Sequence, residues 1–440
     1  MTTRPRRIRW DIVEEHLDEA GFLRQLWEEA LRSPAFSLPE IAEGPEARML
    51  AHLDGLVAAG QPAAKRVLLP ALVEGEPDIA FAAAYALLAS EEGDFAGVVL
   101  REVGAAEPGQ RAAIRRAVSI SPRADLDGRL ASAAREAATP AVQADLLSIL
   151  GERRVDPGLG LETLAGADRA EDLALALRLA GLWPGRLDPI AVERGLSAQE
   201  EAVRAAALTS AMVLGGRGAF AAAEATVAER GPAFATAALL LGLSGDERCL
   251  GPLLEALGDA GTRGAAAYAL GHSGWVEAAD ALLSAMREDE ALAPLAAEGF
   301  AAITGLPVEK QFARPPKRWD PQAEAPEGEA AEPYGPEADL PRPEPEAAAA
   351  WWREARPRLD AGRRWLRGQP WAAESVLREL AAGPARRREA LAVDLAIRSR
   401  GQVQLCWDGL SARQARQMSE AREVASARLW TKTYRDLSGR

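Results

Sequence analysis

The sequence predicts an all-α protein built around an α-solenoid of stacked helix pairs. Short apolar helix ends run into Gly at steps of 30, 34, 27, 29 and 34 residues, and self-similarity near this period is typical of solenoids. Apolar residues make up 48% of the chain and are mostly Ala and Leu, which are strong helix formers, while aromatic residues make up only 5%. The pairs that mark the period are Leu150-Gly151, Ala180-Gly181, Leu214-Gly215, Leu241-Gly242, Leu270-Gly271 and Thr304-Gly305.

The order of the chain predicts four segments. A length of 440 residues exceeds one compact core, so several domains or an extended array are expected. We expect an N-terminal helical cap over 1–60 and the repeat solenoid over 61–306. An acidic Pro/Glu/Ala linker over 307–345 and a small, basic, Trp- and Arg-rich helical C-terminal unit over 346–440 follow.

The cap begins with a helix that is expected over 8–30. Its apolar residues recur at helical spacing and share one stripe, and Ser33-Pro34 stops the helix. Terminal repeats of solenoids are atypical because one of their faces must meet water. The stripe consists of Ile12, Val13, Leu17, Phe22, Leu23, Leu26 and Trp27.

In the array, the Gly that ends each unit is expected to take the left-handed conformation that closes a helix. The stretch 215–218 is rich in Gly, but no strand precedes it and no Gly-Lys-Ser/Thr follows. We therefore expect a turn between helix pairs there and not a phosphate-binding loop. In the C-terminal unit, Gly383-Pro384 precedes a helix that is expected over 385–398.

Charge divides the chain more sharply than its net value of −13 indicates. Residues 351–440 carry 19 Lys and Arg against 10 Asp and Glu, whereas residues 319–350 carry one basic residue against nine acidic ones. The acidic stretch has too few large apolar residues to offset its ordering entropy, so an extended linker is expected. Trp319 and Tyr334 within it are expected to tether it to the solenoid. The overall charge argues against general affinity for nucleic acid.

The expected compartment is the cytoplasm. The basic start of the chain leads directly into acidic residues, without the apolar stretch of a signal peptide. No apolar run reaches the roughly 18–20 residues that a membrane helix needs. Cys249 and Cys406 lie far apart and give no disulfide framework, which suits a reducing environment.

Two array units carry a resemblance to a known repeat. Residues 201–208, Glu-Ala-Val-Arg-Ala-Ala-Ala-Leu, and residues 264–271, Gly-Ala-Ala-Ala-Tyr-Ala-Leu-Gly, resemble the short HEAT-like repeats of phycobilin lyases. The second unit lacks the usual Val-Arg and is degenerate. The resemblance implies a solenoid of HEAT-like helix pairs and, by itself, no activity.

The layout of the whole chain resembles a family of uncharacterised bacterial proteins that are often encoded near type VI secretion genes. This resemblance implies an association with secretion but no mechanism. It rests on both ends of the chain: Ile12–Trp27, Ala51–Gly60, Trp351-Trp352, Gly362–Gly368 and Gly383–Arg388.

The histidines give no metal or catalytic pattern. His16, His52 and His272 have no i, i+4 spacing and no Cys or paired acid in a ligand motif. His16 and His52 are expected to pack between the N-terminal helices, with acids such as Asp18 and Asp54 as partners. No Gly-x-Ser-x-Gly elbow is present. We therefore expect no metal, no cofactor and no catalytic residue, and hence a protein that is not an enzyme.

The best candidate for partner binding is the basic, aromatic C-terminal unit. Its cations are almost all Arg, which offers forked donors and stacks on aromatic rings. Three alternatives remain open: docking onto an acidic protein surface, including the chain's own linker or solenoid; contact with nucleic acid; and a solvated helix face with Trp in the core. The candidate residues are Trp351, Trp352, Arg363, Arg364, Trp365, Arg367, Arg386, Arg387 and Arg388.

The main functional hypothesis is a non-catalytic protein-binding scaffold or adaptor, accessory to type VI secretion as the resemblance implies. Its expected partners are other proteins with acidic surfaces, and neither nucleic acid nor a membrane is expected. One alternative is a nucleic-acid-binding protein that resembles the HEAT-like alkylpurine DNA glycosylases. The other is a lyase-like enzyme of the phycobilin-lyase type, which would need a pocket of perturbed acids or His.

Overall fold

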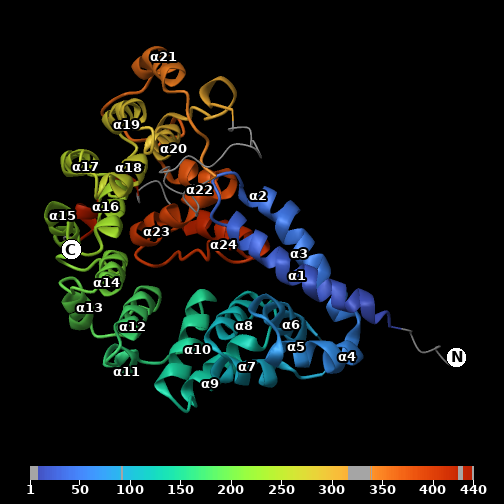
Figure 1. The fold of residues 1–440 in the computed structure, drawn as a ribbon. Coiled ribbons are helices and arrows are strands. Elements are labelled where there is room, and N and C mark those ends of the chain that lie inside the picture. Colours follow the sequence, from blue (N-terminus) through green and yellow to red (C-terminus); the bar gives the residue numbers. More distant parts are fainter. Residues whose placement is uncertain (1–7, 91–92, 316–336, 338, 425–429, 439–440) are drawn as a thin grey trace, which may run out of the picture. The chain divides into compact units, whose positions relative to one another are not determined.

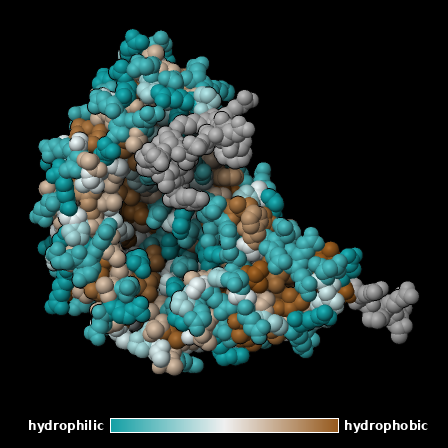
Figure 2. Space-filling view, in the orientation of Figure 1, coloured by the Kyte–Doolittle hydropathy of each residue, from teal (hydrophilic) through white to brown (hydrophobic). Residues whose placement is uncertain are grey.

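The computed structural model describes residues 8–90, 93–315, 337, 339–424 and 430–438. The fold is all-α, as predicted, and the described residues contain one short two-stranded hairpin. In these residues we find no helix with the length and apolar character needed to cross a membrane. The visible face in Figure 2 is largely hydrophilic, with hydrophobic residues in separate patches.

The chain forms two compact units, and each contains segments that are distant in sequence. Unit 1 comprises Met1–Leu31, Leu38–Gly166 and Cys406–Gln417, and unit 2 comprises Arg32–Ser37, Ala167–Leu405 and Met418–Arg440. The boundary expected at residue 346 therefore does not separate two units. Residues 346–405 belong to the same unit as the later part of the array. The contacts that hold them there are made at the C-terminal ends of the array helices.

Unit 1 begins with the long helix α1, and its remaining helices follow in short succession. Their bounds are α1 Trp10–Ala30, α2 Leu38–Ile41, the π-helical turn Ala42–Glu46, α3 Ala47–Ala58, α4 Gly60–Ala63, the π-helical turn Ala64–Leu68, α5 Leu69–Glu74, α6 Pro77–Ala89, α7 Ala96–Ala105, α8 Pro108–Ile120, α9 Leu126–Arg135, α10 Pro140–Glu152, α11 Glu162–Ala165 and the first half of α24 Ser411–Val424.

Unit 2 holds the later array and most of the C-terminal residues. Its elements are α12 Ala170–Leu182, α13 Pro189–Gly195, α14 Glu201–Leu214, α15 Ala219–Glu229, α16 Phe234–Leu243, η3 Glu247–Cys249, α17 Leu250–Leu257, α18 Arg263–Gly271, α19 Val276–Glu288, α20 Ala293–Thr304, η4 Lys310–Phe312, α21 Pro345–Ala355, η5 Arg356–Arg358, β1 Trp365–Leu366, β2 Gln369–Pro370, α22 Ala373–Ala382, η6 Ala385–Arg387, α23 Arg388–Arg398 and α25 Tyr434–Leu437.

Helix α1 lies beside α3 and also packs on α6 (Figure 1). It ends at Ala30, before Ser33-Pro34, as predicted. Its buried stripe includes Val13, Leu17, Leu23 and Trp27. Ile12 and Phe22, which were expected on the same stripe, are 38% and 56% exposed. Helices α6, α8 and α10 then pack in series, each on the next.

The later array repeats one packing step. Helix α12 packs on α14, α14 on α16, α16 on α18, and α18 on α20, while α13, α15, α17 and α19 each pack on a helix of this series. Figure 1 shows the series as successive green to yellow helices. Ala fills much of the buried surface between these helices, because small side chains allow close approach of the backbones.

The periodic glycines have two different roles. Gly215 and Gly305 have φ angles of 71° and 81° and close α14 and α20 in the left-handed conformation, as predicted. Gly181 and Gly242 instead lie inside their helices, and Gly271 is the last residue of α18; none of the three has a positive φ. A Cβ built on Gly181 would be 2.8 Å from Ser210 Oγ on the next helix of the series. These glycines thus permit close packing and do not close their helices in the left-handed conformation.

The expected linker is described only at its ends. Residues 316–336 and 338, with Trp319 and Tyr334, lie outside the described part of the chain. The two flanks pair briefly as an antiparallel bridge between Ala313 and Pro343. Helix α21 then begins at Pro345 and packs on α19. The stretch 215–218 is a turn between α14 and α15, as predicted.

Candidate functional site

The most distinctive surface of unit 2 is the row of helix C-termini along the later array. The last carbonyl groups of a helix have no partner within it, and the helix dipole makes that end negative. The C-termini of α12, α16, α18 and α20 all accept hydrogen bonds from residues of the C-terminal segment. We call this row the carbonyl edge; its accepting residues are Gly181, Leu182, Gly242, Leu243, Ser244, Gly271, His272, Ser273, Gly274, Ala302 and Ile303.

Arg364 places its guanidinium on the end of α18. Its Nε donates to the carbonyl oxygen of Ser273 at 2.6 Å, and its Nη2 donates to that of His272 at 3.1 Å. The guanidinium carbon lies 4.0 Å from the centre of the Trp371 ring. Burial lowers the pKa of Arg364 below its ordinary value. The negative end of α18 thus faces a half-buried cation.

The hairpin formed by β1 and β2 uses its backbone on the same edge. The amide of Trp365 donates to the carbonyl of Gly274 at 2.7 Å. The amide of Arg367 donates to Ala302 at 2.6 Å, at the end of α20. The positive φ of Gly274 and the closeness of the Trp365 backbone leave no room for a side chain there.

Three consecutive arginines follow at the start of α23. Arg386 forms an ion pair with Glu298, with 3.1 Å between Nε and Oε2, and a second with Glu337. Arg387 is 1% exposed and donates through Nη2 to the carbonyl of Gly271 at 2.8 Å. Arg388 is 2% exposed and donates through Nε to Leu380, near the end of α22, at 2.8 Å.

Arg387 also determines the state of His272, which is fully buried. Its Nη2 lies 3.1 Å from His272 Nδ1, and because an arginine only donates, Nδ1 accepts and Nε2 carries the proton. Burial and the nearby Arg387 hold the pKa of His272 well below its ordinary value. The imidazole is therefore neutral.

Several polar atoms around Arg387 have no hydrogen-bond partner among the described residues. They include Arg387 Nε and Nη1, His272 Nε2, Glu298 Oε1 and Glu379 Oε1. Arg387 Nη1 and Glu298 Oε1 are 4.0 Å apart, a separation that one bridging water spans. Burial raises the pKa of Glu379. Each of these side chains is less than a tenth exposed.

Further along α23, Asp394 and Arg398 form a buried pair. Arg398 Nε donates to Asp394 Oδ1 at 2.7 Å, and Arg398 Nη2 donates to the carbonyl of Leu243, at the end of α16. The hydroxyl of Tyr434 donates to the same Asp394 oxygen at 2.7 Å. The pair thus joins three elements: α23, the carbonyl edge and the short helix α25.

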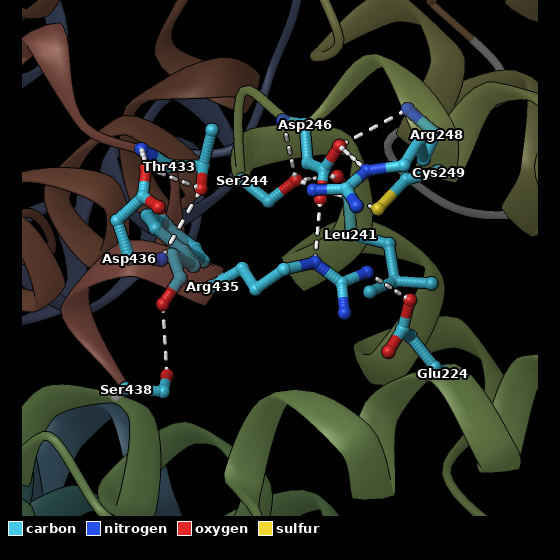
Figure 3. Close-up of polar contacts among 11 residues, drawn as sticks. Glu224, Leu241, Ser244, Asp246, Arg248, Cys249, Thr433, Arg435, Asp436 and Ser438 are labelled. Carbon is cyan, nitrogen blue, oxygen red and sulfur yellow. Dashed lines mark hydrogen bonds and ion pairs between the residues drawn. The ribbon is translucent and has the colours of Figure 1, made fainter.

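The last described residues complete this junction, as Figure 3 shows. Arg435 extends between two acids: its Nε donates to Asp246 Oδ2 at 2.8 Å, and its Nη2 donates to Glu224. Its guanidinium carbon also lies 4.6 Å from the centre of the Phe220 ring. Burial acts to raise the pKa of Asp246, but hydrogen bonds from Arg435 and Arg248 outweigh it and hold the pKa below its usual value.

The nine predicted partner-binding residues do not form one free surface. Trp352 is 3% exposed, and its Nε1 donates to Asp280 on α19 at 2.7 Å, while the Trp351 and Trp352 rings meet Phe300 edge-on. Arg387 and Arg388 are also buried. Trp351, Arg364, Trp365 and Arg386 are half-buried, and Arg363 and Arg367 are exposed.

Sequence reasoning did not select several residues that build the site: Asp394, Arg398, Gln404, Tyr434 and Arg435. Gln404 donates to the carbonyl of Gly181 at 2.9 Å, at the end of α12. The regular spacing of the glycines was the one sequence signal for the positions of the helix ends that form the carbonyl edge. No signal pointed to Tyr434, which is 40 residues from the acid that it contacts.

Unit 1 uses the same chemistry at its own helix ends. Arg153 is 7% exposed and donates through Nη1 to the carbonyls of Val118 and Ser121 at the end of α8, both at 2.9 Å. Arg413, at the start of α24, donates to Arg153. The C-terminal segment is therefore held in both units by Arg on carbonyl groups.

The described residues contain no group of three or more His, Cys, Asp or Glu side chains arranged to hold a metal ion. His16 and His52 contact each other, with 3.2 Å between their Nδ1 atoms, and the expected partners Asp18 and Asp54 do not appear in that contact. The two histidines join α1 to α3.

Comparison with known proteins adds little to this geometry. No protein-family model matches the chain, and no curated protein matches it. A solved structure of human deoxyhypusine hydroxylase in complex with glycerol is similar, with 18% sequence identity. The match covers 66% of this chain and 97% of that chain, with a TM-score of 0.21. A likeness at that score carries no argument about this chain.

Proposed function

We propose that the chain is a non-catalytic protein-binding scaffold built on a solenoid of HEAT-like helix pairs. The series from α12 to α20 supports the solenoid, because each step repeats the same packing and the glycines recur with it. Solenoids of this kind bind through long surfaces on which equivalent positions recur from repeat to repeat.

The observation that carries the proposal is the carbonyl edge. The ends of α12, α16, α18 and α20 together bind one polypeptide segment through Arg, Gln and backbone donors. An array edge that already holds a long segment of its own chain has the chemistry of a protein-binding surface. His272 and Glu379 are buried and give less support to the lyase-like alternative than exposed groups in an open pocket would.

We assign contact with a partner protein to exposed arginines that precede the hairpin in the chain. Arg353, Arg358 and Arg363 are exposed and form no ion pair with any described residue. They lie within the 11-residue stretch 353–363, and the half-buried Trp351 lies two residues before it. Unpaired cations close in sequence to an aromatic residue suit an acidic protein surface. An accessory role in type VI secretion remains part of the proposal through the family resemblance alone.

Burial of Arg387 and Arg388 weakens the nucleic-acid alternative. A phosphate backbone is bound by several exposed Lys or Arg side chains, and these two guanidinium groups already face carbonyl oxygens. The net charge of −13 acts in the same direction.

The test is capture of partners from lysate of the source cells by the full chain, with chemical crosslinking and mass spectrometry. The decisive variant carries Arg353→Glu, Arg358→Glu and Arg363→Glu. This variant is expected to form no crosslinks between the stretch 351–365 and acidic partner peptides. The amount of captured partner is expected to fall by at least about tenfold, because charge reversal creates repulsion across the interface.

The matched control carries Arg32→Glu, Arg48→Glu and Arg101→Glu, which are exposed arginines elsewhere with the same change in charge. It is expected to capture the partner as the wild-type chain does. Equal capture by both variants would exclude the exposed arginines as the contact, and absence of any specific partner for the wild-type chain would count against the scaffold itself.

A further inference from the structure

The last described residues, Trp430–Ser438, behave as a bound peptide; we call them the terminal peptide. Helix α25 within it has only four residues, far fewer than an isolated helix needs for stability in water. Its conformation therefore depends on the surface that holds it. That surface, which we call the receptor site, consists of Phe220, Glu224, Ser244, Asp246, Asp394, Arg398 and Arg400.

One part of the receptor site is selective for a Tyr side chain. Tyr434 is fully buried, and its hydroxyl donates to Asp394 at 2.7 Å. The guanidinium carbon of Arg398 lies 5.1 Å from the centre of the Tyr434 ring. A Phe at this position would fill the same volume but leave the carboxylate one donor short. The slot is therefore selective for a phenol.

The next residue is recognised by charge. The guanidinium of Arg435 lies between Asp246 and Glu224 (Figure 3). The Phe220 ring also lies against this guanidinium. Two carboxylates at separate nitrogens match the fork of an Arg, whereas a Lys has a single charged centre. The ion pairs raise the pKa of Arg435, so the cation is held in its charged form.

Backbone contacts fix the direction of the bound segment. The amide of Tyr434 donates to the carbonyl of Ser244 at 3.1 Å. Arg398 Nη1 donates to the carbonyl of Lys432 at 2.8 Å, and Arg400 Nη2 donates to that of Leu437 at 2.9 Å. These bonds do not depend on the side chains of the ligand, so they serve any segment with Tyr-Arg in this register.

The receptor site is positioned by contacts that do not involve the terminal peptide. Asp246 accepts a hydrogen bond from the amide of Arg248 and caps η3. Asp394 and Arg398 are paired along α23, which packs on α14 and α16. The site thus remains formed when the terminal peptide leaves it.

We propose that the receptor site is a peptide-binding site for a partner-protein segment that carries Tyr followed by Arg, and that the terminal peptide is its occupant in cis. The proposal rests on the scaffold function and specifies one of its ligands. A tethered occupant acts at an effective concentration in the millimolar range. A partner segment therefore binds well only when the terminal peptide is weakened or released.

The test uses a fluorescent synthetic peptide with the sequence of residues 430–438, titrated with the full chain and followed by anisotropy. The full-length double variant Tyr434→Ala, Arg435→Ala empties the site and is expected to bind this peptide about 100-fold more tightly than the wild-type chain, because the cis competitor is lost. A control peptide with Ala in place of both Tyr and Arg is expected to bind neither protein.

A third protein adds Glu224→Gln and Asp246→Asn to the double variant and is expected to lose most of the gained affinity. Equal, weak binding of the peptide to the wild-type chain and to a double variant with native circular dichroism would overturn the proposal. If the double variant does not fold, the single variant Arg435→Ala replaces it, with an expected gain of at least about tenfold and the same overturning outcome.

Two further outcomes separate this proposal from others. The wild-type chain could form dimers at the concentration at which the peptide half-saturates the site, while the double variant does not. That result would make a second copy of the chain the occupant, and it would overturn the assignment to a partner protein. The peptide assay involves only this chain, so its failure leaves the exposed-arginine contact of the scaffold intact. Failure of partner capture likewise leaves peptide binding measurable.

Discussion

Gly271 on α18 lies so close to Gly299 on α20 that a Cβ built on Gly271 would be 2.5 Å from the Gly299 Cα. Real Cβ atoms do not approach another backbone to this distance, so the close approach of the two helices at this point requires glycine. The end of α18 also presents its carbonyls to Arg364 and Arg387. The close contact therefore sets the position of the carbonyl edge as well as the packing of the array.

The first prediction follows from this contact. Gly271→Ala must push α20 away from α18 and is expected to lower the free energy of unfolding by about 1–3 kcal/mol, in the range of overpacked cores. Urea denaturation followed by circular dichroism measures the change. Gly251→Ala on α17, where a Cβ meets nothing within 4 Å, is the control and is expected to be neutral or stabilising by up to about 1 kcal/mol. Equal effects of the two substitutions would contradict the role of Gly271.

The second prediction concerns the fork of Arg364. Arg364→Lys keeps the charge but loses one of the bonds to Ser273 and His272 and the stacking on Trp371. We expect a loss of about 1–3 kcal/mol in unfolding free energy, the usual value of hydrogen bonds to charged groups. Arg363→Lys, one residue away and exposed, is expected to stay within about 0.5 kcal/mol of the wild type. A neutral Arg364→Lys would show that charge alone holds the hairpin.

Asp394 gives the third prediction, since it joins α23 to the terminal peptide. Asp394→Asn leaves Arg398 buried without a carboxylate and weakens the contact to Tyr434. Removing one partner of a buried ion pair costs about 3–5 kcal/mol, and thermal and urea unfolding will measure it. The control is Asp168→Asn, an exposed site in unit 2, with an expected change within about 0.5 kcal/mol. A loss below about 1 kcal/mol would mean that Arg398 is held by carbonyl groups alone.

The elements that the sequence predicted are those that local residues determine, and the rest depend on contacts between distant residues. Helical spacing predicted α1, and the Gly-Pro signal predicted the helix that α23 largely occupies, because local propensity and periodicity determine both. The period of the glycines located the steps of the array. Their role differed at Gly181, Gly242 and Gly271, because close approach depends on the next helix and not on the local chain.

The arginines were harder to predict for a different reason. Arg is usually exposed, so a run such as Arg386–Arg388 indicates a surface. Here Arg387 and Arg388 are buried because their partners are backbone carbonyls at helix ends, which any residue type supplies. A sequence shows where a helix ends but does not mark which distant cation reaches it. The Asp394–Tyr434 contact is hidden in the same way by 40 intervening residues.

The fourth prediction is a dependence of stability on pH that originates at His272. The folded state holds this imidazole neutral and its pKa well below the ordinary value, while the unfolded chain protonates it near pH 6.5. Below that pH the unfolded state binds more protons, so stability is fully present above about pH 6.5 and falls as the pH decreases toward the folded pKa, by at most about 1.4 kcal/mol per pH unit.

Urea unfolding at pH 7.5 and at pH 5.5 measures this dependence. His272→Gln is expected to be less stable than the wild type at pH 7.5, because it disturbs a filled core, but to lose less stability between the two pH values. Tyr268→Phe removes the hydroxyl but keeps the ring, whose centre lies 4.8 Å from that of His272, and it leaves the imidazole in place. It is the control and is expected to retain the wild-type difference. If His272→Gln retains the same difference, the acid sensitivity arises from another group, and the neutral imidazole is not a determinant of stability at low pH.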